Sequence, residues 1–133
     1  ARKFGPVRKL DVDAERLAVA AQEAAEAVME QARAEGEALL TELQEKIARM
    51  NEIFGTEKGQ QMLRAPRTRA AMEALRAESE QVEASLSALG AALQKEAYRD
   101  ALQVGRSARD QADSILADLE QALATGVVPT RSK

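Results

Sequence analysis

Histidine, cysteine and tryptophan are all absent from this chain of 133 residues. Without histidine and cysteine there is no imidazole base, no thiolate nucleophile and no nitrogen or sulfur ligand for a metal ion. The sequence also has no GxxxxGK or GxGxxG phosphate-binding motif. These absences exclude most catalytic chemistry. We therefore expect a protein that is not an enzyme and that binds no metal or other cofactor.

Carboxylates are the remaining candidates for chemistry. Pairs such as Glu23 with Glu26, or Asp110 with Asp113, lie three residues apart on predicted helices. Helical di-iron sites add a histidine to such pairs, which this chain does not have. We interpret the carboxylates as solvated helix faces with partners one turn away, for example Glu42 with Lys46.

Aromatic residues make up only 2% of the chain, and the net charge is −3 with acids and bases interleaved. Binding of nucleic acid favours stacking aromatics or a basic face, so we expect no nucleic-acid partner. No apolar run reaches the roughly 18 residues needed to cross a bilayer. We expect a soluble chain. It begins with Ala1 rather than methionine, which is consistent with an upstream segment having been removed or left out.

Strand-forming residues are also scarce, whereas alanine, glutamate, glutamine, arginine and leucine dominate. This composition is typical of long helices and coiled coils, so the sequence predicts an all-α fold. Glycine and proline divide the chain into a few parts. These are a basic N-terminal arm 1–12, a helix 13–54, a connector 55–67, a helix 68–125 and a flexible C-terminal tail 127–133.

Local signals mark the ends of the predicted helices. The first helix stops at Gly55 and the second at Gly126, because glycine tolerates the left-handed conformation that ends many helices. Thr68 is suited to cap the second helix. Within the connector, Thr56 is suited to cap one short helical turn around residues 60–64.

Apolar residues recur every eleven residues in both predicted helices. One row is Leu17, Val28, Leu39 and Met50, and another is Ala71, Val82, Leu93, Val104 and Ile115. Eleven residues in three turns is about 3.67 per turn, so the apolar stripe hardly drifts around the helix. The repeat predicts nearly straight rods. Small residues on neighbouring rows with the same spacing, such as Gly36 and Gly90, predict a close approach of the two helices.

Residues 13–126 are therefore predicted to form a long antiparallel helical hairpin, coiled-coil-like in its packing. In the matching register, Val28 lies near Leu93 and Leu17 near Val104. At 1.5 Å per residue the helices are about 63 and 85 Å long. The second helix then overhangs the first by about 20 Å, over residues 110–125.

Three arrangements satisfy this apolar overhang. The N-terminal arm folds back over it, another chain covers it, or the second helix bends near Gly90 or Gly105 into a three-helix bundle. We expect another chain, because a two-helix hairpin buries only one narrow stripe on each helix. The sequence thus predicts a homo-oligomer or a subunit of a larger complex.

Candidate partner-binding residues fall in three apolar groups. They are Phe4, Val7 and Leu10 in the arm, Met50, Phe54, Met62 and Leu63 at the hairpin tip, and Ile115, Leu116, Leu119 and Leu123 in the overhang. An apolar cluster at the end of a rod is well placed to contact a protein. Two alternatives stay open at this point: the tip residues seal the end of the hairpin, and the arm is a disordered end.

We interpret the chain as a non-enzymatic structural or adaptor subunit that self-associates or packs into a larger assembly through its helical seams. Bacterial secretion, conjugation, phage and scaffold complexes use such parts. One alternative is an export-chaperone-type module, in which the stripe of the second helix holds a client's amphipathic helix. A second is an amphipathic protein on a membrane surface. A membrane surface is disfavoured as a partner, because the apolar face lacks tryptophan and has few lysines at its borders.

Overall fold

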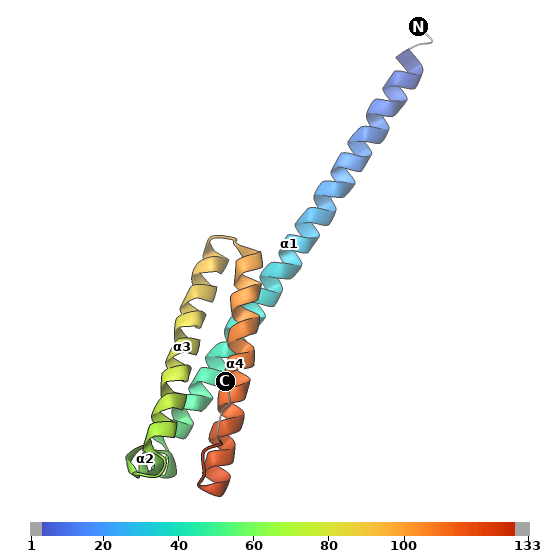
Figure 1. The fold of residues 1–133 in the computed structure, drawn as a ribbon. Coiled ribbons are helices and arrows are strands. Elements are labelled where there is room, and N and C mark those ends of the chain that lie inside the picture. The colour runs from blue at the N-terminus through green and yellow to red at the C-terminus, as the bar shows by residue number, and fades with distance from the viewer. Residues whose placement is uncertain (1–3, 130–133) are drawn as a thin grey trace.

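The structure, a computed structural model, describes the backbone of residues 4–129 and the side chains of residues 13–129. Four helices and no strand make up the described residues, which confirms the all-α prediction (Figure 1). The helices are α1 (Phe4–Gly55), α2 (Glu57–Arg64), α3 (Arg69–Gln94) and α4 (Tyr98–Thr125).

Helix α1 begins inside the segment that was expected to be a separate arm. Its first residue is Phe4, so the start of the helix predicted at residue 13 is wrong, and residues 4–12 of the expected arm are helical. Pro6 is compatible with this because it lies in the first turn, where a backbone N–H has no partner within the helix. Residues 1–3 lie outside the described part of the chain. The helix ends at Gly55, as predicted.

The short helix α2 is built by the cap that the sequence predicts. The Thr56 hydroxyl accepts a hydrogen bond from the Gly59 amide at 3.0 Å. The helical turn expected around 60–64 is confirmed, and it begins earlier, at Glu57. Thr68 does not cap α3 with its side chain. Its hydroxyl donates instead to the Met62 carbonyl, which ties the start of α3 to α2.

The predicted helix 68–125 is not continuous. It breaks at residues 95–97, and neither at Gly90 nor at Gly105. Glu96 adopts a left-handed conformation with φ 58°. The Ala97 amide donates to the Ala92 carbonyl at 2.9 Å and the Glu96 amide to the Leu93 carbonyl at 3.1 Å. This is the Schellman pattern, usually built on glycine, and here it reverses the chain.

The C-terminal half of α1, α3 and α4 form a three-helix bundle (Figure 1). Arg106 Nε donates to Glu35 Oε2 at 2.8 Å, and farther along both helices Lys46 pairs with Asp113. Because residue numbers rise together in these two contacts, α4 runs parallel to α1. Helix α3 runs antiparallel to both. The bent arrangement that the sequence left as an alternative is therefore the one observed.

Two glycines mark where the helices approach one another most closely. A Cβ atom on Gly36 would lie 2.6 Å from Leu93 Cδ2, and one on Gly105 would lie 2.9 Å from Leu39 Cδ1. Leu93 thus packs beside Gly36 and not beside Val28, so the predicted hairpin register is wrong. Gly90 has open space around its Cα and makes no close approach.

The core of the bundle is aliphatic and runs along its full length. Its largest fully buried side chains are Leu43, Met50, Ile53, Met72, Leu75, Val82, Leu89, Ile115 and Leu119. Small residues of α4, such as Ala101 and Ala112, fill the narrower layers. One buried polar side chain, Ser79, donates its hydroxyl hydrogen to the Arg76 carbonyl at 2.8 Å. The bundle therefore packs as a domain core.

The overhang lies on a different helix from the one predicted. Residues 110–125 belong to α4 and pack against α1 and α3, with Ile115 and Leu119 fully buried. The first half of α1 projects instead, as the long blue helix of Figure 1. Every residue from 13 to 31 is exposed. One helix still extends beyond its neighbours, as predicted, but this helix is α1 and not the C-terminal helix.

Candidate interaction surface

The projecting part of α1 carries an apolar stripe along one face. Because residues three, four, seven and eleven apart share a helix face, the stripe is easily traced in the sequence. It consists of Ala14, Leu17, Ala18, Ala21, Ala25, Val28, Met29 and Ala32. Leu17 is 72% exposed and Val28 67% exposed. No charged residue lies among these positions.

This stripe has the same phase as the buried face of α1 within the bundle. Leu17 and Val28 belong to the eleven-residue row that continues into Leu39 and Met50, and these last two are buried against α3 and α4. The stripe is therefore a continuation of the core-facing surface beyond the end of the bundle. It differs from the buried part only in having nothing packed on it in the isolated chain.

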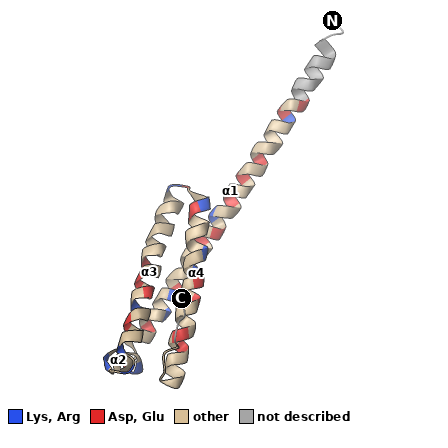
Figure 2. Ribbon diagram, viewed as in Figure 1, with Lys and Arg blue, Asp and Glu red and all other residues tan. Residues whose placement is uncertain are grey.

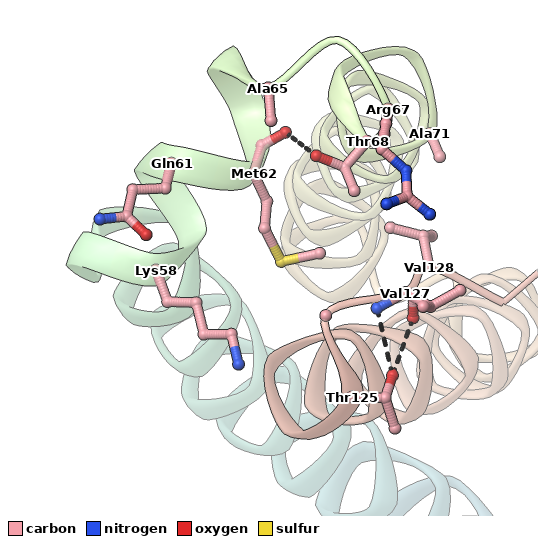
Figure 3. A pocket seen from close by; sticks show the side chains of 11 residues that line it. Lys58, Gln61, Met62, Ala65, Arg67, Thr68, Ala71, Thr125, Val127 and Val128 are labelled. Atoms are coloured by element: carbon pink, nitrogen blue, oxygen red, sulfur yellow. Dashed lines mark hydrogen bonds between the residues drawn. The ribbon is translucent and has the colours of Figure 1, made fainter.

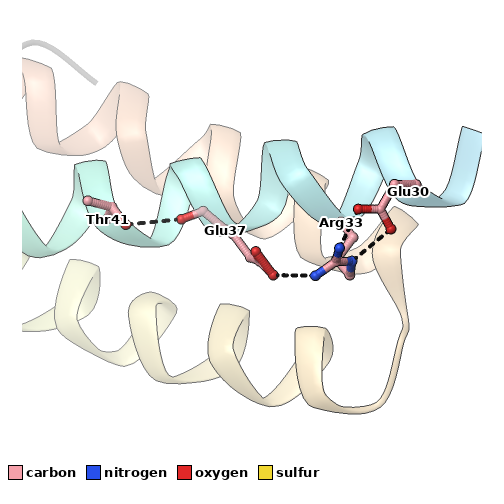
Figure 4. A network of polar contacts seen from close by, with 4 residues as sticks. All are labelled: Glu30, Arg33, Glu37 and Thr41. Carbon is pink, nitrogen blue, oxygen red and sulfur yellow. Dashed lines mark hydrogen bonds and ion pairs between the residues drawn. The ribbon is translucent and has the colours of Figure 1, made fainter.

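Charged residues are spaced along the projecting helix (Figure 2). By helical periodicity Glu23, Glu26 and Glu30 lie on the face away from the stripe. Arg33 links one turn in each direction along the helix: its Nε donates to Glu30 Oε2 at 3.0 Å and its Nη1 to Glu37 Oε1 at 2.9 Å (Figure 4). The hydrogen bond and charge of Arg33 lower the pKa of Glu30, and Glu30 raises the pKa of Arg33. The acidic residues thus lie away from the stripe, with α1 leaving the bundle near this network.

The α3–α4 turn closes one end of the stripe. Glu96 and Tyr98, from this turn, line a shallow cleft together with Met29, Glu30 and Arg33 of α1. Toward the C-terminus from this level, α3 and α4 occupy the apolar face of α1. Toward the N-terminus, the face is open.

A second concave surface lies at the base of the bundle, between α2 and the residues that follow α4 (Figure 3). Its cavity has a volume of about 490 Å³, with Met62, Val127 and Val128 on its apolar side and Arg67 beside it. Lys58 donates to the Leu123 carbonyl, close to the C-terminal end of α4. The Lys58 ammonium is thus engaged with the protein itself, and the Arg67 side chain is exposed to solvent.

The residues predicted to bind a partner lie mostly in the core. Met50, Phe54 and Met62 are buried at the base of the bundle with Leu63 against them, which is the sealing role that the sequence left open. In α4, Ile115 and Leu119 are buried and Leu116 and Leu123 partly buried. None of these eight residues forms a free docking surface in the structure. The side chains of Phe4, Val7 and Leu10 lie outside the described residues.

The exposed large apolar residues of the stripe that sequence reasoning did not select are Leu17, Val28 and Met29, whereas Val19 and Val127 are exposed outside the stripe. The sequence pattern does contain Leu17 and Val28, because they are the first two residues of one eleven-residue row. They were not selected as exposed residues because the predicted register paired both of them with the second helix. The apolar stripe along 68–125 that was expected to hold a client helix is covered within the bundle, by α1 and by the packing of α3 on α4.

The described residues present neither a metal site nor a membrane-spanning helix. They contain no group of three or more acidic residues placed to hold a metal ion. In the same part of the chain, no helix combines the length and the apolar character that a membrane-spanning segment needs.

Comparison of the chain with protein-family models, with curated proteins and with solved structures finds no match.

Proposed function

We propose that this protein is a non-enzymatic structural or adaptor subunit, in which the three-helix bundle anchors a projecting helix that packs into a larger assembly. The observation that carries the proposal is the exposed apolar stripe on residues 14–32 of α1. The absence of histidine and cysteine from the sequence supports the non-enzymatic part.

Helix energetics support a packed partner for this segment. Most helix stability in proteins comes from the packing of an amphipathic face rather than from helix propensity alone. The exposed residues 13–31 extend about 28 Å at 1.5 Å per residue and bury no apolar side chain. A second helical surface on the stripe would bury Leu17 and Val28 and stabilise the whole segment.

The bundle suits an anchoring role because its own core is complete. Ile115, Leu119 and Met50 are each fully buried without a partner chain. The free surface is thus concentrated on the projecting helix. Such a subunit would present the projecting part of α1 as a recognition element, held at a defined distance from the three-helix bundle.

The test is site-specific photo-crosslinking in the cells that produce the protein. A photoreactive amino acid at Leu17 or Val28 should give discrete adducts of defined mass, because both positions lie on the stripe. The matched control is Val19, which is 54% exposed on the opposite face of the same helix and should give none. Equal adducts from all three positions, or no adduct from any, would contradict the proposed function.

A further inference from the structure

The cavity at the base of the bundle combines basic and apolar side chains and has no acidic residue in its lining. Its cations are Lys58 and Arg67, and its apolar side is made by Met62, Val127 and Val128. We infer that this cavity binds an acidic peptide segment of a partner protein, with one apolar side chain inside the cavity and carboxylates at Arg67. The cavity is separate from the stripe of α1, so the inference goes beyond the proposed function and does not depend on it.

Positive charge is concentrated around the cavity, although the whole chain has a net charge of −3. Residues 58–72 carry four cations and no acid, namely Lys58, Arg64, Arg67 and Arg69. In Figure 2 blue residues gather around α2, at the base of the bundle. Arg64 and Arg69 lie within three residues of Arg67, and with a Debye length of about 10 Å they add to the potential at the cavity. The cavity therefore attracts a negatively charged ligand.

The cations at the cavity have no carboxylate partner in the described part of the chain. Arg64, Arg67 and Arg69 make no ion pair there, whereas basic residues of α1 and α4 pair with carboxylates. Lys58 donates to the Leu123 carbonyl, a neutral group, so its charge is not neutralised. The exposed Arg67 guanidinium offers a planar fork of donors that matches a carboxylate in bidentate geometry.

The apolar side of the cavity is formed by the residues that follow α4. Gly126 ends α4 in the left-handed conformation, and the Thr125 hydroxyl accepts a hydrogen bond from the Val127 amide at 3.2 Å (Figure 3). Val127 and Val128 thus line the cavity, with Val127 60% exposed. The volume of about 490 Å³ lies within the range of roughly 300–1,000 Å³ for ligand pockets. An apolar side chain that enters it would remove the exposed valine surface from water.

This combination favours an acidic peptide over other anions. Inorganic phosphate would use the cations and leave Val127 and Val128 uncovered. Nucleic-acid strands are held by aromatic stacking, and neither Phe54 nor Tyr98 lines the cavity. Residues 130–133 carry two cations and no acid, so their charge does not complement the cavity. Arginine clusters are a recurring means of binding acidic motifs of other proteins.

Titration of the isotope-labelled full chain with synthetic peptides tests the site directly. The probes are four pentapeptides that carry leucine, isoleucine, methionine or phenylalanine between two pairs of glutamates, with both ends blocked. At least one should shift the backbone amide signals of Arg67, Ala71 and Val128 in proton–nitrogen spectra, with a dissociation constant below about 1 mM. Signals of residues 13–31 should stay in place. No shift at the cavity with any of the four at about 5 mM would overturn the inference.

Matched variants test the two parts of the cavity. Arg67→Gln should raise the dissociation constant about fivefold, the upper end for an exposed ion pair. Arg99→Gln removes the same charge from an exposed residue at the other end of α4 and should leave the constant unchanged. Val127→Ser should also weaken binding, whereas Val19→Ser on the projecting helix should not. All four positions are exposed, so circular dichroism should report an intact bundle in each variant. Equal losses from Arg67→Gln and Arg99→Gln would mean that only net charge matters, which would contradict a site.

Control ligands test the chemistry of the occupant. Replacing the glutamates by glutamine, or the central residue by glycine, should weaken binding, and so should a rise in salt from about 0.05 to 0.5 M. Equal shifts with inorganic phosphate or with a single-stranded oligonucleotide of the same charge would show a general anion surface and refute the peptide assignment. Absence of peptide binding together with retained photo-adducts at Leu17 and Val28 would refute this inference alone and leave the proposed function standing.

Discussion

Leu119→Ala and Leu17→Ala make the same chemical change at two positions that the structure treats very differently. Leu119 is fully buried between the helices of the bundle, whereas Leu17 is 72% exposed on the projecting helix. Truncating a fully buried leucine removes its transfer free energy and leaves a cavity, which together cost about 3 kcal/mol. Truncating an exposed leucine in a helix costs close to nothing, because alanine is the better helix former.

Urea unfolding followed by circular dichroism at 222 nm measures both changes. The chain should be kept at the lowest workable concentration, so that self-association does not contribute. We expect Leu119→Ala to lower the free energy of unfolding of the bundle by about 3 kcal/mol, equivalent to roughly 15 °C in Tm for a domain of this size. Leu17→Ala should change it by less than about 0.5 kcal/mol.

The two variants together distinguish the observed three-helix bundle from the predicted hairpin, in which the C-terminal end of the second helix is uncovered. In that hairpin, Leu119 is exposed on the overhang and Leu17 is packed against the second helix, so the two costs exchange places. A loss below about 1 kcal/mol for Leu119→Ala would refute the argument that α4 completes the core.

Three further predictions concern the base of the bundle, its ion pairs and the projecting helix. Gly59→Ala should destabilise the protein by about 2 kcal/mol, because the new Cβ would lie 2.2 Å from the Ile53 carbonyl oxygen. Gly90→Ala is its control and should add about 0.5–1 kcal/mol, since nothing lies within 4 Å of that Cβ position; similar losses for both would refute the contact argument. The hydrogen bond to Asp113 raises the pKa of Lys46 above its ordinary value of 10.5, so the stability it contributes is complete below that pH and is lost as pH rises through the raised value. Lys46→Met should flatten this alkaline loss in unfolding measured between pH 9 and 12, and an unchanged slope would show that the pair contributes nothing. Amide hydrogens of residues 13–31 should exchange faster than those of 39–54 in the monomer, as read by mass spectrometry, and equal protection would contradict the projecting helix.

The division of the molecule into a complete bundle and an unpaired helix has a consequence for recognition. Under the proposed function, binding through α1 would leave the bundle core unchanged, because none of the fully buried residues of the core belongs to the stripe. A variant such as Leu17→Glu is therefore expected to separate association from folding.

Helix type and most helix ends were predictable from local chemistry. Gly55 and Gly126 end α1 and α4, and Gly126 adopts the left-handed conformation with φ 77°. Thr56 caps α2 through the bond that its hydroxyl makes to the Gly59 amide. These outcomes depend on residues within one turn of each other, so no distant contact was needed to foresee them.

The turn at residues 95–97 had no such signal. It contains neither glycine nor proline, and Glu96 takes a conformation that costs a residue with a side chain about 1–3 kcal/mol. The eleven-residue rows run through it without a change of phase, so periodicity does not reveal it. Burial of α4 against α1 and α3 outweighs the local cost, because it covers side chains such as Ile115 and Leu119 completely.

The amino-acid pattern established that this protein is helical, where three of its four helices end, and that one apolar face runs along each long helix, because these properties arise from neighbours within a few residues. Which faces meet was decided by packing among distant segments. The same stripe of α1 is buried at Leu39 and bare at Leu17, since α3 and α4 are long enough to cover only half of it.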